Sequence, residues 1–131
     1  MRKRQHESGQ AMVEFTLILP LFILLLFGLV DFGCYFTHSL SVTSAAREGA
    51  RAGVIYAYDA DFFTKVKTKV TDSAPDLDPA YLVTTVTKTG ASGKEDVVVS
   101  LDYTAKSLTP VGMMLWGPEY HVKSSCTMKI G

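Results

Sequence analysis

The chain has 131 residues, which is enough for one small domain and an anchoring segment but not for two full globular domains. Thirteen Lys and Arg residues balance thirteen Asp and Glu residues, so the net charge gives no reason to expect a nucleic-acid partner. The positive charge is nevertheless unevenly placed, because Arg2, Lys3 and Arg4 precede a long apolar stretch.

Residues 1–9 form a basic leader that ends in a small residue, Gly9. Five positions later a single carboxylate, Glu14, stands at the start of the apolar stretch. This order suggests cleavage after Gly9, which would make Gln10 the first residue of the mature chain. It also predicts the orientation, because basic residues that flank a membrane helix stay in the cytoplasm.

Residues 15–30 are sixteen uncharged, mostly apolar residues, slightly fewer than the roughly 20 that a membrane-spanning helix needs. Apolar residues at 11–13 and 32–36 lengthen the segment, so we expect a transmembrane helix over residues 10–36. A removable secretory signal is the alternative, but no Ala-x-Ala cleavage site follows Val30. We therefore expect a single-pass protein of the inner membrane whose C-terminal part is extracytoplasmic.

The helical pattern continues beyond the membrane segment, and one helix is expected from about Gln10 to Val54. Pro20 lies inside it, where proline removes a backbone hydrogen bond and clashes with the previous turn, so a kink is predicted. In the extracytoplasmic continuation, residues 37–56, small residues recur at every fourth position. They are Ala45, Gly49 and Gly53. This spacing places them on one face and lets another helix or a sheet approach closely.

The remaining residues, 57–131, are expected to form a small extracytoplasmic α+β domain. Asp59 or Asp61 can cap a second helix that ends near Val70. Its apolar side is predicted to consist of Phe62, Phe63, Val66 and Val70. The prolines in residues 73–79 then predict a loop.

Three β-strands are predicted after this loop, at residues 81–89, 96–106 and 121–130, with a turn at 90–93 joining the first two. Apolar and polar residues alternate in the second and third strands. The side chains expected to face inward are Val97, Val99, Leu101 and Tyr103 of the second strand and Val122, Ser124, Cys126, Met128 and Ile130 of the third. The fold class is therefore α+β, with a three-stranded antiparallel sheet covered on one side by the two helices.

Two features of this domain have competing interpretations. The apolar connection 108–118 either folds onto the core, which we favour, or exposes a patch toward the membrane interface or a neighbouring subunit. That patch would consist of Met113, Met114, Leu115 and Trp116. Cys34 and Cys126 could form a disulfide, but two buried free thiols are the simpler interpretation because one lies at the membrane end of the anchor.

No catalytic or metal-binding constellation emerges from the sequence. His6, His38 and His121 are far apart and follow no metal-ligand spacing, and no glycine-rich phosphate loop or Ser-His-Asp pattern is present. We therefore expect no cofactor and no enzymatic activity.

Glu14 is the single charge with a candidate role, and it has two interpretations. It is either a favourable anion in the first turn of a helix, or a carboxylate that is costly in apolar surroundings and seeks a cationic partner. After cleavage, the α-amine of Gln10 in one subunit could neutralise Glu14 of its neighbour and fix their axial register. The charge would then serve assembly.

The sequence Gly-Gln-Ala-Met-Val-Glu-Phe, which begins at Gly9, resembles the class III signal of type IV pilins. In that signal a prepilin peptidase cleaves after the glycine and glutamate is the fifth mature residue. Residues 9–21, together with 28–33 and the Ala-Ala-Arg-Glu-Gly-Ala-Arg-Ala-Gly segment at 45–53, resemble more specifically the TadE-like family, which are minor pseudopilins of the Tad/Flp tight-adherence pilus.

The resemblance implies a minor pseudopilin that helps to initiate or cap a thin adhesive pilus. Its expected partners are the prepilin peptidase, other Tad pilins and pseudopilins, the inner-membrane assembly platform and the lipid bilayer. It would stay at the base of the pilus or enter the surface filament. The main alternative is an uncleaved single-pass protein whose outer domain binds an envelope partner, and an exported enzyme is a third and weaker hypothesis.

Overall fold

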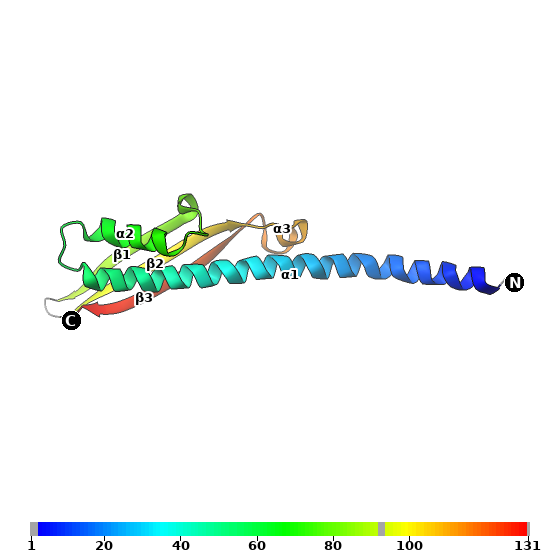
Figure 1. Cartoon of the computed structure of the whole chain (residues 1–131), viewed down its shortest axis with the longest axis horizontal. Coiled ribbons are helices and arrows are strands. Elements are labelled where there is room, and N and C mark those ends of the chain that lie inside the picture. Colours follow the sequence, from blue (N-terminus) through cyan, green and yellow to red (C-terminus); the bar gives the residue numbers. More distant parts are fainter. Residues whose placement is uncertain (1–2, 92–93, 131) are drawn as a thin grey trace.

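The chain forms one long helix with a small α+β domain packed around its C-terminal half (Figure 1). The computed structural model describes residues 3–91 and 94–130, and the side chains from residue 8 onward. The helices and strands are α1 (Lys3–Ile55), α2 (Phe62–Ser73), η1 (Pro79–Tyr81), β1 (Leu82–Ala91), β2 (Lys94–Lys106), α3 (Pro110–Trp116) and β3 (Glu119–Ile130). The predicted α+β class is confirmed, and α3 and η1 are additions to it.

Helix α1 is 53 residues long and begins at Lys3, earlier than the predicted start near Gln10. It continues without interruption through Gly9 and through Pro20. A single glycine lowers helix stability by about 1 kcal/mol relative to alanine, which the helix-forming residues on either side offset. The predicted kink at Pro20 remains a prediction.

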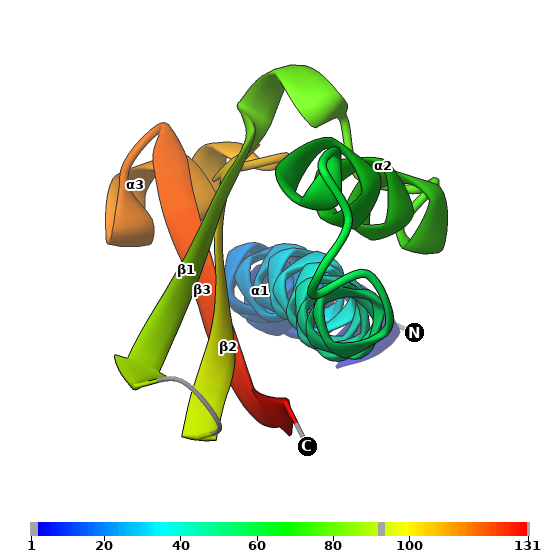
Figure 2. The ribbon, with the colours of Figure 1, turned by 90° about the vertical axis from the view of Figure 1, so that its left-hand side faces the viewer.

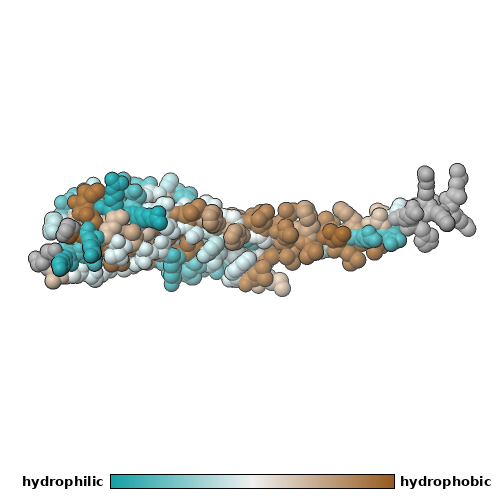
Figure 3. All heavy atoms as spheres, turned by 90° about the horizontal axis from the view of Figure 1, so that it is seen from below, coloured by the Kyte–Doolittle hydropathy of each residue, from teal (hydrophilic) through white to brown (hydrophobic). Residues whose placement is uncertain are grey.

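The N-terminal half of α1 is apolar and uncovered, as the hydrophobic surface in Figure 3 shows. This helix is long and apolar enough to cross a membrane, and its most apolar window is entirely unburied within the chain. The helix of a soluble core would instead be covered by its own domain. The uncovered apolar half therefore supports membrane anchoring.

The three strands form one antiparallel sheet in the order β1-β2-β3. Val99 in the central strand is opposite Val86 of β1 and Cys126 of β3. The predicted alternation is confirmed. Six of the residues predicted to face inward are buried, namely Val97, Val99, Leu101, Tyr103, Val122 and Ile130, whereas Ser124, Cys126 and Met128 are half-buried. Of the predicted turn, Gly90 and Ala91 belong to β1, whereas positions 92 and 93 lie outside the described residues.

The C-terminal half of α1 and helix α2 cover the same face of the sheet (Figure 2). Two glycines of α1 make this packing close. A Cβ atom at Gly49 would overlap Cγ2 of Val70, and one at Gly53 would lie 2.6 Å from Cγ1 of Val97. Close-packed interiors have no room for such an atom, so both positions require glycine.

Helix α2 differs from its prediction in two respects. Phe62, Val66 and Val70 are buried, but Phe63 is 55% exposed because it is one residue, and so about 100°, away from the buried row. Asp61 occupies the N-cap position without a side-chain capping hydrogen bond. Asp59 accepts a 2.5 Å hydrogen bond from Lys65, which raises the pKa of that lysine.

The connection between β2 and β3 corrects the favoured prediction for residues 108–118. It contains a helix, α3, and only Gly112 of that helix is buried. Met113, Met114, Leu115 and Trp116 are exposed, with Met114 at 89% and Trp116 at 58%. The connection therefore does not fold onto the core, because α3 is held beside α1 at the end of the sheet rather than over it (Figure 1).

Both cysteines are free, as the free-thiol interpretation predicted. They are half-buried rather than buried. Cys34 lies on α1 and Cys126 on β3.

Candidate assembly and anchoring sites

The predicted processing site lies on the uncovered part of α1. Gly9 and Gln10 are exposed, and a Cβ atom at Gly9 would meet nothing within 4 Å. Packing against the described side chains therefore does not demand glycine at this position. Because the bond after Gly9 is inside a helix, a peptidase would have to unwind the helix locally to reach it.

Glu14 lies on the same exposed part of α1, between the exposed apolar side chains of Val13 and Phe15. The nearby polar group of Thr16 is already satisfied, since its hydroxyl donates to the carbonyl oxygen of Met12 at 2.8 Å. Among the described side chains, none forms an ion pair with Glu14. A carboxylate in apolar surroundings without a partner is unfavourable, so this position is suited to a cation supplied from another molecule.

The small-residue face of α1 is used inside the chain. Ala45 and Gly49 are fully enclosed by the outer domain, and Gly53 lies against Val97 of β2. These positions are therefore not free to pack against another subunit while the domain is folded. The N-terminal half of α1, by contrast, presents an exposed apolar surface that other subunits can contact.

Asp31 is the centre of a polar cluster that sequence analysis missed. It sits at the end of the apolar run of α1, yet it is only 8% exposed. Its carboxylate accepts hydrogen bonds from the backbone N–H of Leu108 at 3.3 Å and of Thr109 at 3.2 Å. The Thr109 hydroxyl donates to the other carboxylate oxygen. We call these contacts between Asp31, Leu108 and Thr109 the Asp31 clasp.

The clasp joins α1 to the start of α3. Thr109 is the N-cap of α3, and its hydroxyl oxygen accepts from the N–H of Gly112 at 3.1 Å. Pro110 follows at the first helical position, where its fixed φ favours a helix. Gly112 is required because a Cβ there would overlap the Asp31 carboxylate. Every polar group at the clasp thus has a partner, which is what burial of a carboxylate demands.

An open pocket of about 420 Å³ adjoins the clasp, between α1, α3 and β3. Its walls are largely aromatic and include Phe32, Tyr35, Trp116 and Tyr120. Burial raises the pKa of the Tyr120 phenol above its ordinary value. The phenol oxygen lies 2.9 Å from Nδ1 of His38, and this contact gives that histidine a structural role.

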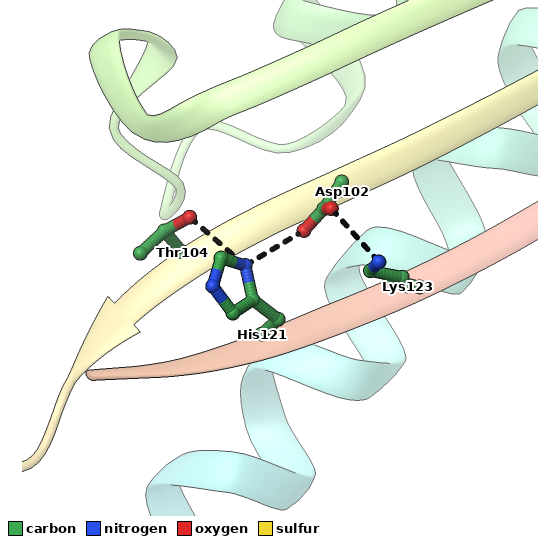
Figure 4. A network of polar contacts seen from close by, with 4 residues as sticks. All are labelled: Asp102, Thr104, His121 and Lys123. Atoms are coloured by element: carbon green, nitrogen blue, oxygen red, sulfur yellow. Dashed lines mark hydrogen bonds and ion pairs between the residues drawn. The ribbon is translucent and has the colours of Figure 1, made fainter. Parts of the chain in front are cut away.

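The third histidine, His121, belongs to a surface network on the uncovered face of the sheet (Figure 4). Its Nδ1 lies 3.2 Å from both Asp102 and Thr104, and Lys123 lies 3.4 Å from the other Asp102 oxygen. The side chain of His6, at the other end of the chain, is outside the described part of the structure. Within that described part, no three His, Cys, Asp or Glu side chains are grouped to hold a metal ion.

This surface network is expected to contribute little to stability. Replacing Asp102 by alanine should lower the free energy of unfolding by less than about 1 kcal/mol, because exposed ion pairs are screened by water and salt. Chemical denaturation of the full chain in detergent micelles measures this value. A loss of several kcal/mol would instead indicate that the network is a structural or binding centre.

Residues 9–51 match the model of the TadE-like protein family, which confirms the resemblance seen in the sequence. The match covers about a third of the chain and lies entirely within α1, so it does not include residues 57–131. It indicates a protein associated with a Tad pilus. Comparisons with curated proteins and with solved structures gave no match.

Proposed function

We propose that this chain is a minor pseudopilin that takes part in initiating or capping a Tad/Flp pilus. The observation that carries the proposal is the TadE-like sequence of residues 9–51 on a helix whose N-terminal half is apolar and uncovered. Such a helix can anchor the chain in the inner membrane and then pack against other pilin helices. The N-terminus would face the cytoplasm and the sheet domain the outside.

The proposal assigns a processing step to the leader. The prepilin peptidase removes residues 1–9, and Gln10 becomes the first residue of the mature chain. Exposure of Gly9 and Gln10, and the absence of packing at Gly9, support this assignment. The new α-amine of Gln10 is then available to pair with Glu14 of a neighbouring subunit.

The proposal also assigns the two halves of α1 different tasks. Gly49 and Gly53 attach the helix to its own sheet domain, whereas the uncovered half is left for other subunits, the assembly platform and lipid. No catalytic step is assigned to any residue.

Processing is tested by intact-mass measurement of the protein isolated from cells with and without the prepilin peptidase. We expect a chain beginning at Gln10 only when the peptidase is present. Gly9→Val should block this change, because a branched side chain replaces the glycine at the bond to be cut. Gly28→Val is the matched control, since Gly28 is also unpacked and lies on the same helix.

A chain that begins at Met1 in piliated wild-type cells would contradict the proposal. It would favour the uncleaved single-pass protein whose outer domain binds an envelope partner. Blocked cleavage in the Gly28→Val control would show that the substitution acts through the helix in general and not through the processing site.

A further inference from the structure

We propose that α3 is an interfacial element that inserts its apolar side chains into the lipid headgroup region of the bilayer, at the C-terminal end of the membrane span. The occupant of this surface is lipid rather than another protein. The inference needs only the membrane span of α1, so it does not depend on the proposed role in a pilus.

Helix α3 lies at the C-terminal end of the uncharged part of α1. Gly112 packs against Asp31, and Val111 lines the same apolar groove as Leu24 and Phe27. Helix α3 therefore lies beside the last turn of the uncharged run, residues 15–30, and not beside the outer part of α1 (Figure 1). If residues 15–30 span a bilayer, α3 therefore lies at the surface of that bilayer.

The uncharged run is too short to cross the hydrocarbon core of a bilayer by itself. Sixteen residues at 1.5 Å each cover about 24 Å, which is less than the roughly 30 Å of a hydrocarbon core. The apolar zone must therefore extend past one or both ends of the run. At the C-terminal end the side chains of Phe32, Tyr35 and Phe36 are exposed and continue the apolar surface beyond Asp31, the residue that contacts α3.

The connection between β2 and β3, which contains α3, has a composition suited to the membrane interface. Residues 107–118 carry no charged side chain, and the four large apolar side chains exposed on α3 include the single tryptophan of the chain. Tryptophan is enriched where a membrane meets water, because its ring is apolar and its N–H is polar. In Figure 3 the hydrophobic surface of α1 reaches the outer domain, with further hydrophobic atoms projecting where α3 lies in Figure 1.

The Asp31 clasp makes it possible for a carboxylate to lie this close to the membrane. A bare carboxylate at the edge of the apolar zone would oppose insertion. Here two backbone N–H groups and the Thr109 hydroxyl bind it, so the charge is satisfied within the chain. The same bonds fix the depth of α3 relative to the span.

Trp116 allows a direct test because it is the only tryptophan. The full chain is reconstituted into phosphatidylcholine and phosphatidylglycerol vesicles, with or without bromine atoms on the acyl chains. We expect lipids brominated near the headgroup end to reduce the emission of Trp116 at least about twofold, and lipids brominated near the chain end to quench less, as an interfacial position requires. The result does not depend on the orientation of the protein, because both leaflets carry bromine.

The control moves the reporter to the far end of the outer domain. In the double variant Trp116→Phe, Tyr58→Trp, position 58 is in an exposed loop where the native tyrosine is 86% accessible. Its emission should be insensitive to brominated lipid and fully open to aqueous quencher. If brominated lipid does not reduce the emission of Trp116, the proposal is overturned. A blue-shifted emission that brominated lipid does not reduce would mean that Trp116 contacts protein.

Discussion

Cells that carry Glu14→Ala in place of the wild-type chain are expected to lose their Tad pili while retaining the protein in the membrane. Glu14 stands alone between apolar side chains, and among the described residues it has no ionic partner. Under the proposed function its partner is the Gln10 α-amine of the next subunit. Removing one member of a buried charge pair costs about 3–5 kcal/mol, and each 1.4 kcal/mol is a factor of ten, so assembly should fall by more than about a hundredfold.

The measurement is the amount of pilin in the sheared surface fraction, together with carbonate extraction of membranes and the intact mass of the subunit. Carbonate extraction should show the variant still embedded, because alanine makes the span more apolar. The intact mass separates a failure of processing from a failure of assembly. A variant that is inserted, processed and unable to assemble is the expected result.

Asp72→Ala is a suitable control, since it removes the same charge from an exposed position on α2. It should leave piliation at the wild-type level. Normal piliation with Glu14→Ala would remove the axial-register role, and the carboxylate would then be no more than a favourable charge near a helix N-terminus.

The two halves of α1 explain why this test addresses assembly and not folding. The outer half is committed to its own domain, because Ala45, Gly49 and Gly53 pack against α2 and the sheet. The part of the inner half around Glu14, residues 8–27, is exposed at every position. A substitution at Glu14 therefore leaves the folded core untouched.

Most of the fold was predictable because its signals are local. The alternation of residues 97–103 depends only on the period of a β-strand, and the spacing of Gly49 and Gly53 depends only on the period of a helix. Both patterns are confirmed as buried faces. The start of α1 and the exposure of Phe63 were predicted wrongly, since helix ends and the edges of a buried face depend on neighbours that a local pattern does not specify.

The Asp31 clasp was not predictable in the same way. Asp31 and Thr109 are 78 positions apart, and no periodicity connects them. Two weak local signals existed: a lone carboxylate at the end of an apolar run, and the Thr-Pro pair that commonly starts a helix. The predicted packing of residues 108–118 onto the core is wrong, because apolar composition alone does not distinguish a core segment from one suited to a membrane surface.

Gly49→Ala is expected to destabilise the outer domain, although alanine is the better helix former. The new methyl group would overlap Cγ2 of Val70 and lie 3.2 Å from Cγ1 of Val99. Overpacking of this kind costs about 1–3 kcal/mol, which exceeds the gain of up to about 1 kcal/mol from helix propensity. For a domain of this size, each kcal/mol of lost stability lowers the midpoint of thermal unfolding by about 4–8 °C. Circular dichroism of the full chain in detergent micelles measures the midpoint.

Gly33→Ala is the matched control, because Gly33 lies on the same helix and a Cβ there would meet nothing within 4 Å. It should leave the midpoint unchanged or raise it, since only the helix propensity changes. Val70→Ala removes the methyl group that Gly49→Ala would strike, so the double variant should be more stable than the sum of the two single effects predicts, by at least about 0.5 kcal/mol. Strict additivity would show that α1 and α2 are not in the contact that fixes glycine at position 49. The coupling therefore measures directly how closely the anchoring helix is joined to the domain it carries.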